Sequence, residues 1–408
     1  MNIDRTAAAP TAAPISSSPP STENWKIPAG ASMVTAVFVL SNAASPLYPH
    51  WQRQFAFSSV TLTVIFAAYI AGLLGALLIA GQLSDRLGRK AVLLPGLLMA
   101  MAACGLFMTA SSVVSLVAAR FLSGVAVGVI VSAGMAAVVD LGGPKRKRQA
   151  SQTASIAMVL GAGLGPLLAG TLAQWMAHPI WAIFGIELAL LAIAIAVVLA
   201  IRLPDARGVV TVERLRLPSV RAQNRRDLAL GIAVFAPGLS ATSFVLSLGP
   251  ALLSNLLHVS SPLVVSGTAC FMFMSAAGVQ LAVKKQPIRT VLLLGTAATL
   301  LSMAALIGAI HASAPALLLG AAGLAGMGQG LGQSGGLTAI SMKVPDRQRA
   351  EASSLLNIGA YIPAGLLTVA TGFLVDHVGM TAGATTFAVA LVFAAATAAY
   401  FILKGQHE

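Results

Sequence analysis

The feature that most constrains this chain is a charged segment enclosed by two long apolar runs. The segment reads GQLSDRLGRK and covers residues 81–90. Each neighbouring run holds about 20 residues, the length that a helix needs to cross a hydrocarbon core about 30 Å thick. A short charged connection between two such helices lies at the membrane surface. We therefore expect an integral membrane protein.

The composition extends this expectation to the whole chain. Of the 408 residues, 57% are hydrophobic and 9% are charged, whereas soluble domains have about 25% charged residues. Runs of spanning length lie at about 27–48, 60–82, 91–110, 113–140, 151–174, 180–201, 228–252, 262–283, 288–310, 315–341, 352–374 and 381–403. The two cysteines, Cys104 and Cys270, fall inside apolar runs, which argues against a disulfide framework or a zinc site. The pattern predicts an all-α protein with twelve transmembrane helices.

The polar segments divide these helices into two sets. Residues 1–24 are rich in Ala, Pro, Ser and Thr and are expected to be a disordered tail, and residues 202–227 are the long polar interior segment. We expect six-helix bundles at 25–201 and 228–408, joined by a linker at 202–227. Residues 147–170 and 347–372 form an internal repeat, each with a basic loop, small polar residues and a Gly and Pro interruption. Transporters with parallel repeats bind their substrate between the repeats near mid-membrane.

The net charge of +13 has an uneven distribution that predicts orientation. One set of alternate loops holds Arg86, Arg89, Lys90, residues 145–148, seven arginines in the linker, Lys284, Lys285, Arg289, Lys343, Arg347 and Arg349, and the other set holds Arg53. Cytoplasmic loops carry the excess of Lys and Arg, so we expect both termini and the linker in the cytoplasm. The basic residues form no continuous face, which argues against nucleic-acid binding. A multi-pass protein of the plasma membrane, in bacteria the inner membrane, fits this pattern.

The segment at 81–90 resembles the signature of the major facilitator superfamily. The matching residues are Gly81, Leu83, Asp85, Arg86, Gly88, Arg89 and Lys90. The resemblance implies two six-helix bundles related by pseudo-twofold symmetry, with the signature in the cytoplasmic loop between helices 2 and 3. It also implies that Asp140 pairs with an arginine of the signature, so that Asp85, Arg86, Arg89 and Asp140 latch the outward-open state. Merely solvated interfacial charges are the alternative.

Three further stretches resemble the twelve-helix drug:proton antiporter branch of that superfamily. They are LSNAASPLYP at the end of the first span, LVAARFLSGVAVG with Arg120, and GAGLGPLLAG with Gly161, Gly165, Pro166 and Gly170. Ala169 departs from the last motif, where a second glycine is usual. Physically, Pro46 and Pro49 must break or kink the first helix, since they lack the backbone donor. The resemblance implies proton-coupled efflux.

Two charged residues lie deep in apolar runs and are candidates for proton coupling. Arg120 and Glu187 both enter from the outer side to a depth of roughly 12 Å at 1.5 Å per residue. Burial disfavours a charged carboxylate and a nearby arginine favours it, so a carboxyl group under both influences suits proton exchange. The alternatives are an arginine that pins two helices through backbone carbonyls, a fixed ion pair between the two residues, and a Glu187 that faces outward near the interface. Asp376, near the outer end of the eleventh span, is the next candidate proton carrier.

Polar residues inside other spans are candidates for a substrate cavity. They are Asn42, Tyr69, Gln329, Gln333, Asn357 and Tyr361, and each also has a reading as a structural hydrogen-bonding group. The stretch GMGQGLGQSGG, residues 326–336, imitates a dinucleotide-binding loop, but no strand precedes it. We expect its glycines to pack helices.

These observations together predict a secondary transporter of a small molecule, coupled to protons and working by alternating access. We expect a protein that is not an enzyme, is monomeric and uses no cofactor or metal, with protons, a small-molecule substrate and the lipid bilayer as partners. Proton-coupled uptake and sugar efflux share the same signature and remain alternatives. A membrane sensor or enzyme on a transporter scaffold is a further alternative, disfavoured because the spans hold no nucleophile with its base and no metal-ligand cluster.

Overall fold

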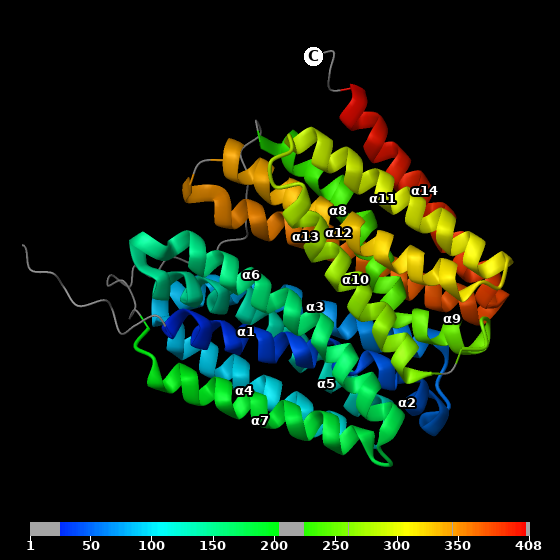
Figure 1. Ribbon diagram of the computed structural model, residues 1–408, viewed down its shortest axis with the longest axis horizontal. Helices are drawn as coiled ribbons and strands as arrows, with labels where there is room; N and C mark the ends of the chain where they lie inside the picture. The colour runs from blue at the N-terminus through cyan, green and yellow to red at the C-terminus, as the bar shows by residue number, and fades with distance from the viewer. Residues whose placement is uncertain (1–24, 204–223, 260, 345, 405–408) are drawn as a thin grey trace, which may run out of the picture.

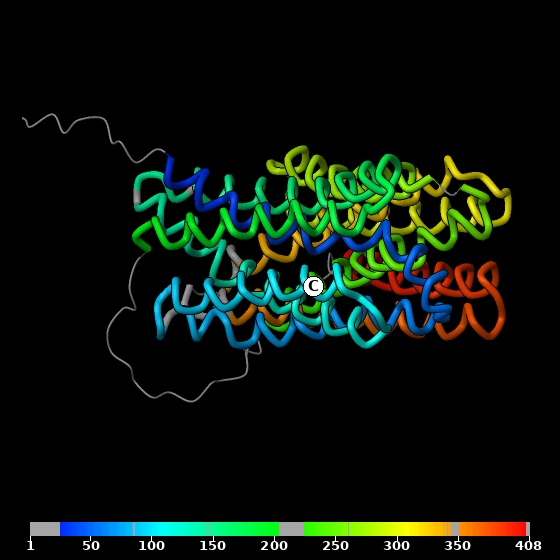
Figure 2. Tube along the Cα trace, turned by 90° about the horizontal axis from the view of Figure 1, so that it is seen from below, coloured from blue at the N-terminus to red at the C-terminus, as the bar shows by residue number. Residues whose placement is uncertain are grey.

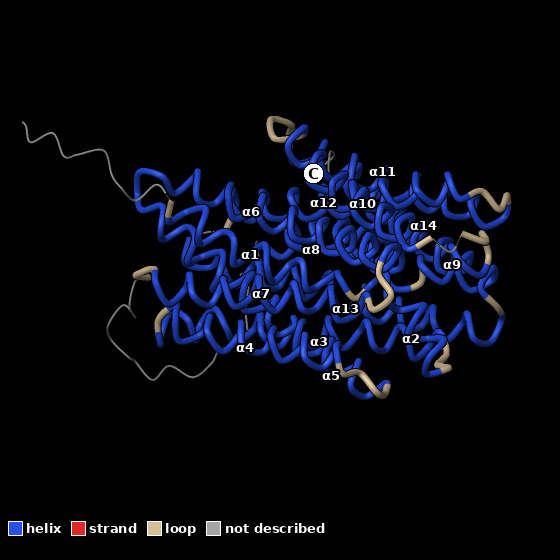
Figure 3. The backbone as a smooth tube through the Cα atoms, turned by 60° about the horizontal axis from the view of Figure 1, so that its bottom comes forward, coloured by secondary structure: helices blue, strands red, loops and turns tan. Residues whose placement is uncertain are grey.

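A computed structural model describes residues 25–203, 224–259, 261–344 and 346–404. The expected tail at 1–24 and most of the expected linker lie outside these residues. The first half contains α1 (Lys26–Ala43), the 3₁₀ turn η1 (Ser45–Leu47), α2 (Tyr48–Phe55), α3 (Ser59–Leu87), α4 (Arg89–Met108), α5 (Val113–Val129), the π-helical turn η2 (Ile130–Gly134), α6 (Met135–Trp175) and α7 (Pro179–Ala200). The second half contains α8 (Arg225–Ser247), α9 (Gly249–Asn255), α10 (Pro262–Ala282), α11 (Ile288–His311), α12 (Pro315–Lys343), α13 (Asp346–Val378) and α14 (Met380–Lys404). Helices make up almost all of this part of the chain, with short connections between them (Figure 3).

The long helices form the expected twelve spans. Among the described residues, eleven helices are long and apolar enough to cross a membrane. One of these spans, Val113–Gly143, joins α5, η2 and the start of α6, and the next, Lys145–Trp175, is the remainder of α6. The backbone leaves helical geometry between them, at Gly143 (φ 56°) and Arg146 (φ −119°). The twelfth long helix is α12, whose many glycines and two glutamines make it less apolar than the others.

Proline sets the ends of two spans. Helix α1 ends at Ala43, and η1 and α2 follow with Pro46 and Pro49 in their first turns, so the predicted break in the first span is confirmed. The seventh span has an equivalent break that the sequence reading missed, where α9 begins at Gly249 with Pro250 in its first turn. Both breaks follow from the missing N–H of proline.

The signature at residues 81–90 lies almost entirely within two helices and does not form a hairpin loop at the membrane surface. Helix α3 continues through the signature to Leu87, and α4 begins at Arg89. The whole connection is Gly88, whose φ of 93° is a conformation that side chains other than hydrogen disfavour. Gly81 therefore lies inside α3 and does not end it, which corrects the expected boundary. The second half also begins earlier than expected, since Arg225 to Asp227 already belong to α8.

Glycines bring the second and fourth spans of each half into backbone contact. In the first half, a Cβ atom built at Gly124 of α5 would lie 2.0 Å from the carbonyl oxygen of Tyr69 on α3. In the second half, a Cβ atom at Gly326 of α12 would lie 2.0 Å from the carbonyl oxygen of Met272 on α10. Such separations are possible only for glycine, and small residues allow this close approach in membranes. The same contact in both halves supports the pseudo-twofold relation of the two bundles (Figure 1).

The two bundles meet along two helix pairs, α6 with α10 and α3 with α13. Their tightest contacts lie toward the end of the molecule that carries η1, α2 and α9, which we call the closed end (Figures 1 and 2). There, a Cβ atom at Gly170 of α6 would meet Ser266 of α10, and one at Gly372 of α13 would lie 2.3 Å from Oγ1 of Thr63 on α3.

The bundles diverge toward the opposite end, which carries the turns at Gly88 and at Gly143–Arg146 and which we call the basic end. Ile156, Gly163 and Gly170 follow one another at seven-residue intervals and therefore share one face of α6. Gly170 and Gly163 touch α10, but Ile156, nearer the basic end, is 55% exposed. On α10, Leu281 at the same end is 69% exposed. The helices thus separate beyond Gly163.

Candidate translocation site

Arg120 on α5 is the buried cation at the centre of the first bundle. Its side chain is 1% exposed, and it donates hydrogen bonds to the Tyr48 hydroxyl group, to the Ser41 carbonyl oxygen at 2.6 Å and to Ser45 Oγ at 3.5 Å. These three acceptors flank the break between α1 and α2. The last carbonyl groups of a helix lack intrahelical partners, and Arg120 supplies one. The arginine therefore joins α5 to the broken first span.

Aromatic rings surround the same guanidinium group. Its central carbon lies 5.0 Å from the ring centre of Tyr48, 6.0 Å from that of Tyr69 and 5.9 Å from that of Phe107. Cations within about 6 Å of an aromatic ring face are attracted by the ring quadrupole. Neutral acceptors and rings thus stabilise this charge, and no carboxylate among the described residues forms an ion pair with it.

Glu187 on α7 is buried but does not pair with Arg120. Its side chain is 0% exposed, and neither carboxyl oxygen has a hydrogen-bond partner among the described residues. Phe107, whose ring centre is 5.9 Å from the Arg120 guanidinium carbon, stacks on Phe184 of α7 with ring centres 4.9 Å apart. The alternative of a fixed ion pair is therefore wrong for this conformation. A buried carboxyl group without partners is far more stable neutral than ionised.

The candidate cavity residues fall on both sides of the bundle interface. Tyr69 on α3 and Tyr361 on α13 are half-buried and lie next to the contact between Ile70 and Gly365, where the two bundles touch. Asn42 donates to the hydroxyl group of Ser41, whose carbonyl oxygen binds Arg120. The structure thus groups Asn42, Tyr69 and Arg120 in the first bundle, with Tyr361 facing them from the second.

The other three cavity candidates lie in the second bundle. Gln329 and Gln333 are half-buried on α12, and the side-chain oxygen of Gln329 has no partner among the described residues. A polar atom of this kind is a suitable acceptor for a ligand donor. Asn357 donates to the carbonyl oxygen of Ser353 on its own helix at 3.0 Å, which favours the structural reading for this residue.

The signature residues form an ion pair within the first bundle. Arg89 Nε lies 3.1 Å from Asp140 Oδ2, and the same guanidinium group donates to Ser84 Oγ at 2.9 Å. This pair joins α4 to α6. The side chain of Asp85 lies outside the described residues, and Arg86 is in the last turn of α3. The pairing of Asp140 with a signature arginine therefore stands, and the latch as a whole stays a prediction.

The GAGLGPLLAG stretch contacts two neighbours at once. Cβ atoms at Gly161 and Gly165 would lie 2.5 and 2.2 Å from the carbonyl oxygens of Thr35 and Val39 on α1. Gly170, one turn beyond Pro166, faces α10 of the other bundle. These glycines pack α6 against the first span and against the opposite bundle.

Asp376 has a different environment from a buried proton carrier. It is exposed at the closed end, and its two carboxyl oxygens accept hydrogen bonds from the backbone N–H groups of Ser59 and Val60, each at 2.9 Å. The donors belong to the first turn of α3 in the other bundle. Asp376 therefore caps a helix across the bundle interface.

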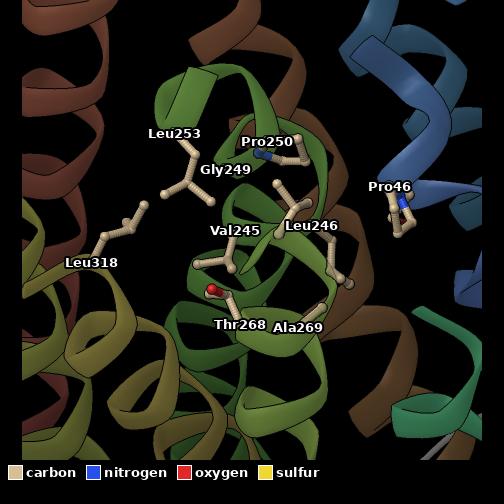
Figure 4. A pocket seen from close by; sticks show the side chains of 11 residues that line it. Pro46, Val245, Leu246, Gly249, Pro250, Leu253, Thr268, Ala269 and Leu318 are labelled. Carbon is tan, nitrogen blue, oxygen red and sulfur yellow. The ribbon is translucent and has the colours of Figure 1, made fainter. Parts of the chain in front are cut away.

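A small pocket lies at the closed end between the two proline breaks. Pro46 of η1 faces Leu246 and Pro250 across it (Figure 4). Its lining is largely apolar, so it holds no polar group set that would orient a substrate. No group of three or more His, Cys, Asp or Glu side chains in the described part of the chain could hold a metal ion.

The comparison with known proteins decides the family. Residues 31–287 match the sequence model of the Major Facilitator Superfamily. The chain belongs to this superfamily. The predicted fold of two six-helix bundles is confirmed by this match and by the helix arrangement.

Curated relatives of this superfamily member are named as transporters. A triacylglyceride transporter of Mycobacteroides abscessus is 34% identical over 139 residues, which are 34% of this chain and 26% of the relative. The 3-(3-hydroxy-phenyl)propionate transporter of Escherichia coli is 34% identical over 133 residues, which are 32% of this chain and 31% of the relative. The chain thus matches less than a third of the length of these relatives.

Solved transporters of low sequence identity share the fold over nearly the whole chain. The peptide transporter POT superposes with a TM-score of 0.75 at 16% identity and covers 93% of this chain and 94% of its own. The nucleoside transporter NupG gives 0.73 at 13% identity, with coverage of 93% and 99%. A bacterial homologue of the human lysosomal transporter Spinster, inward-facing and unoccupied, gives 0.72 at 16%, with coverage of 94% and 97%. At sequence identities this low, the similarity shows a shared fold and nothing further.

Proposed function

We propose that the protein is a secondary transporter that moves a small molecule across the membrane by alternating access. The observation that carries this proposal is the bundle interface, which is tight at the closed end and diverges toward the basic end. Two rigid bundles in contact at one end form one of the two states that a rocking mechanism needs. The names of the curated relatives support transport, although each matches only part of this chain.

The orientation proposed from the charges makes this state inward-open. The turns at Gly88 and at Gly143–Arg146 lie at the basic end, together with Arg89, Lys90 and the residues around the Lys343 end of α12. Loops rich in Lys and Arg remain in the cytoplasm. We therefore propose that the basic end, both termini and the linker are cytoplasmic, and that the protein is in the plasma membrane, in bacteria the inner membrane.

Proton coupling is the part of the proposal that rests on Glu187 and Arg120. Glu187 is buried without a partner on α7, and α7 packs on α1. Arg120 holds the end of α1 through Ser41 and the following break through Ser45 and Tyr48. The first span therefore connects the two residues, and a rearrangement at its break changes the surroundings of both. We propose that Glu187 carries the coupling proton and that Arg120 sets its affinity through α1.

Efflux is the proposed direction, and it rests on the resemblance of the α6 glycine stretch to the antiporter motif. The packing of Gly161 and Gly165 on α1, and of Gly170 on α10, supports a role of this stretch in the rocking motion. Proton-coupled uptake would use the same residues and the same proton gradient, with the substrate moving in the same direction as the proton instead of the opposite one. A monomer is sufficient for this mechanism, since both bundles belong to one chain.

A second candidate concerns the substrate. Arg120, Tyr48 and Tyr69 combine one cation with two phenol rings, and Tyr361 lies opposite in the second bundle. Arg120 and Tyr48 are buried in this conformation, so a substrate would reach them only after the break of the first span rearranges. A cation beside aromatic rings would then suit a small aromatic carboxylate, and the Escherichia coli relative is named for such a compound. This favours an organic anion over a sugar as the first substrate to test.

The experiment is a transport assay in proteoliposomes with an imposed pH gradient. The screen should include 3-(3-hydroxyphenyl)propionate, neutral drugs and sugars. The proposal requires gradient-dependent movement of at least one compound by the wild type, and Glu187→Gln should bind that compound without accumulating it. Accumulation by Glu187→Gln at the wild-type level would contradict the role of Glu187. An absence of all transport over the screen would favour a sensor on the same scaffold.

A further inference from the structure

The first turn of α3 is completed by the opposite bundle. Ser58 is the N-cap, and the first intrahelical bond runs from the Leu62 N–H group to the Ser58 carbonyl oxygen at 3.1 Å. The N–H groups of Ser59, Val60 and Thr61 therefore have no partner within the helical ladder. Ser58 Oγ accepts from Thr61 at 3.3 Å, and the remaining two donate to Asp376 on α13.

Asp376 lies where its own helix disfavours it. It is in the last turn of α13, which ends at Val378, and the C-terminal end of a helix carries partial negative charge. The neighbouring N-terminus of α3 carries partial positive charge, and it presents the two N–H groups that have no acceptor within α3. The acid is thus stabilised by α3 in the other bundle and destabilised by the helix that bears it.

We propose that Asp376 is a latch that holds the closed end shut. The contact joins α3 to α13 beside the tight approach of Gly372 to Thr63, where the two bundles touch. Opening this end separates α3 from α13, exposes two N–H groups to water and leaves the carboxylate beside the C-terminus of its own helix. The contact therefore exists in one conformation only and biases the equilibrium toward that conformation. This inference rests on the alternating access proposed above, but it requires neither protons nor a known substrate.

Two substitutions weaken the contact from opposite sides. Asp376→Asn keeps the shape of the side chain, removes its charge and replaces one acceptor with a donor. Ser59→Pro removes one N–H donor at the first helical position, where proline is favoured. Ser58, the preceding residue, has φ −78° and ψ 172°, which a following proline permits. His377→Gln is the matched control. The imidazole Nδ1 of His377 lies 2.9 Å from the carbonyl oxygen of Phe373 on the same helix, so this side chain is adjacent to Asp376 but hydrogen-bonds within α13.

The measurement is a distance distribution across the closed end. Spin labels at Gln54 of α2 and Ala312 beyond α11, both exposed, report that end by pulsed electron resonance after Cys104 and Cys270 have been replaced. Each of the two substitutions should raise the ratio of long to short distances about tenfold, which corresponds to about 1.4 kcal/mol. The double variant should shift no further than Asp376→Asn alone, since both changes remove one contact.

The outcomes separate this proposal from others. Unchanged distances in both Asp376→Asn and Ser59→Pro would overturn the latch and leave a local helix cap. An equal shift in His377→Gln would also overturn it, because the effect would then belong to the helix end in general. If no substrate is ever found, the proposed transport fails while the distances still report the latch. If transport is found and the distances do not change, the latch alone fails.

Discussion

Replacing Glu187 by methionine should make the protein more stable and abolish its coupling. The carboxyl group is 0% exposed, and both of its oxygens lack hydrogen-bond partners among the described residues. Mutational data place the free-energy penalty of burying a neutral polar group without a partner at about 1–3 kcal/mol. Methionine has a similar length and a flexible apolar side chain, so it can fill the same space without that penalty. Glu187→Met should therefore raise the free energy of unfolding by about 1–3 kcal/mol.

Thermal unfolding in detergent measures this difference. At about 2.1 cal/mol/K per residue, the unfolding entropy of 408 residues is about 0.9 kcal/mol/K, so a change of 1 kcal/mol shifts Tm by about 1 °C and Glu187→Met should gain about 1 to 3 °C. Glu187→Gln stays polar and unsatisfied, and should remain close to the wild type. Leu188→Met, on the half-buried neighbour, is the control for methionine itself and should change stability by less than about 1.5 kcal/mol.

The same variants then enter the transport assay. A residue kept for function at the expense of stability should give a variant that is more stable and inactive. Glu187→Met should lose gradient-driven accumulation, while binding to the wild type should depend on pH because proton and substrate are linked. A loss of stability in Glu187→Met would show that the carboxyl group has a partner and would refute the reasoning. Full accumulation by the stabilised variant would refute the proton role.

Three further predictions test orientation, the signature and the helix packing. A cysteine introduced by Leu215→Cys in the linker should react with an impermeant reagent only after cells are opened, and labelling of intact cells would reverse the assigned orientation. Asp85→Asn should shift the protein toward inward-open states, and unchanged distances across the basic end would leave the signature without a latch role. Gly124→Ala should lower the free energy of unfolding by about 1–3 kcal/mol, because the new Cβ atom would lie 2.0 Å from the Tyr69 carbonyl oxygen. Gly75→Ala, whose Cβ atom would meet nothing within 4 Å, should instead gain about 0.5–1 kcal/mol, and equal Tm shifts of the two variants would contradict the packing argument.

The spans were predictable because each is a long uninterrupted apolar run, and a single segment satisfies all of its backbone groups within itself in lipid only as a helix. Their ends were less predictable. Helix α3 continues to Leu87 through charged residues, since a helix can leave the membrane before it ends. The break at Gly249 and Pro250 carried a readable signal, the proline, but the surrounding apolar run concealed it.

The sequence identified Arg120 and Glu187 as buried charged residues, but it did not show whether they contact each other. Arg120 and Glu187 have matched depths, but depth does not fix the direction in which a side chain leaves its helix. Arg120 turns toward Ser41 on α1 and Tyr69 on α3, whereas Glu187 is buried on α7, which packs on α1 and α4. Asp376 was recognised as an acid near the outer end of its span. Its partners, Ser59 and Val60, are more than 300 positions earlier in the chain, and only the packing of the two bundles brings them together.

Helix α12 packs closely against three neighbouring helices because glycines occupy the positions where it touches them. Cβ atoms at Gly326 and Gly330 would collide with α10, one at Gly328 with Thr299 of α11, and one at Gly332 with Phe235 of α8. A larger residue at any of these positions would push the neighbouring helix away. A second substitution elsewhere on α12 would not create room at that contact. Variation along α12 is therefore expected at the residues between these glycines, such as Gln329 and Gln333, while the glycines themselves stay fixed.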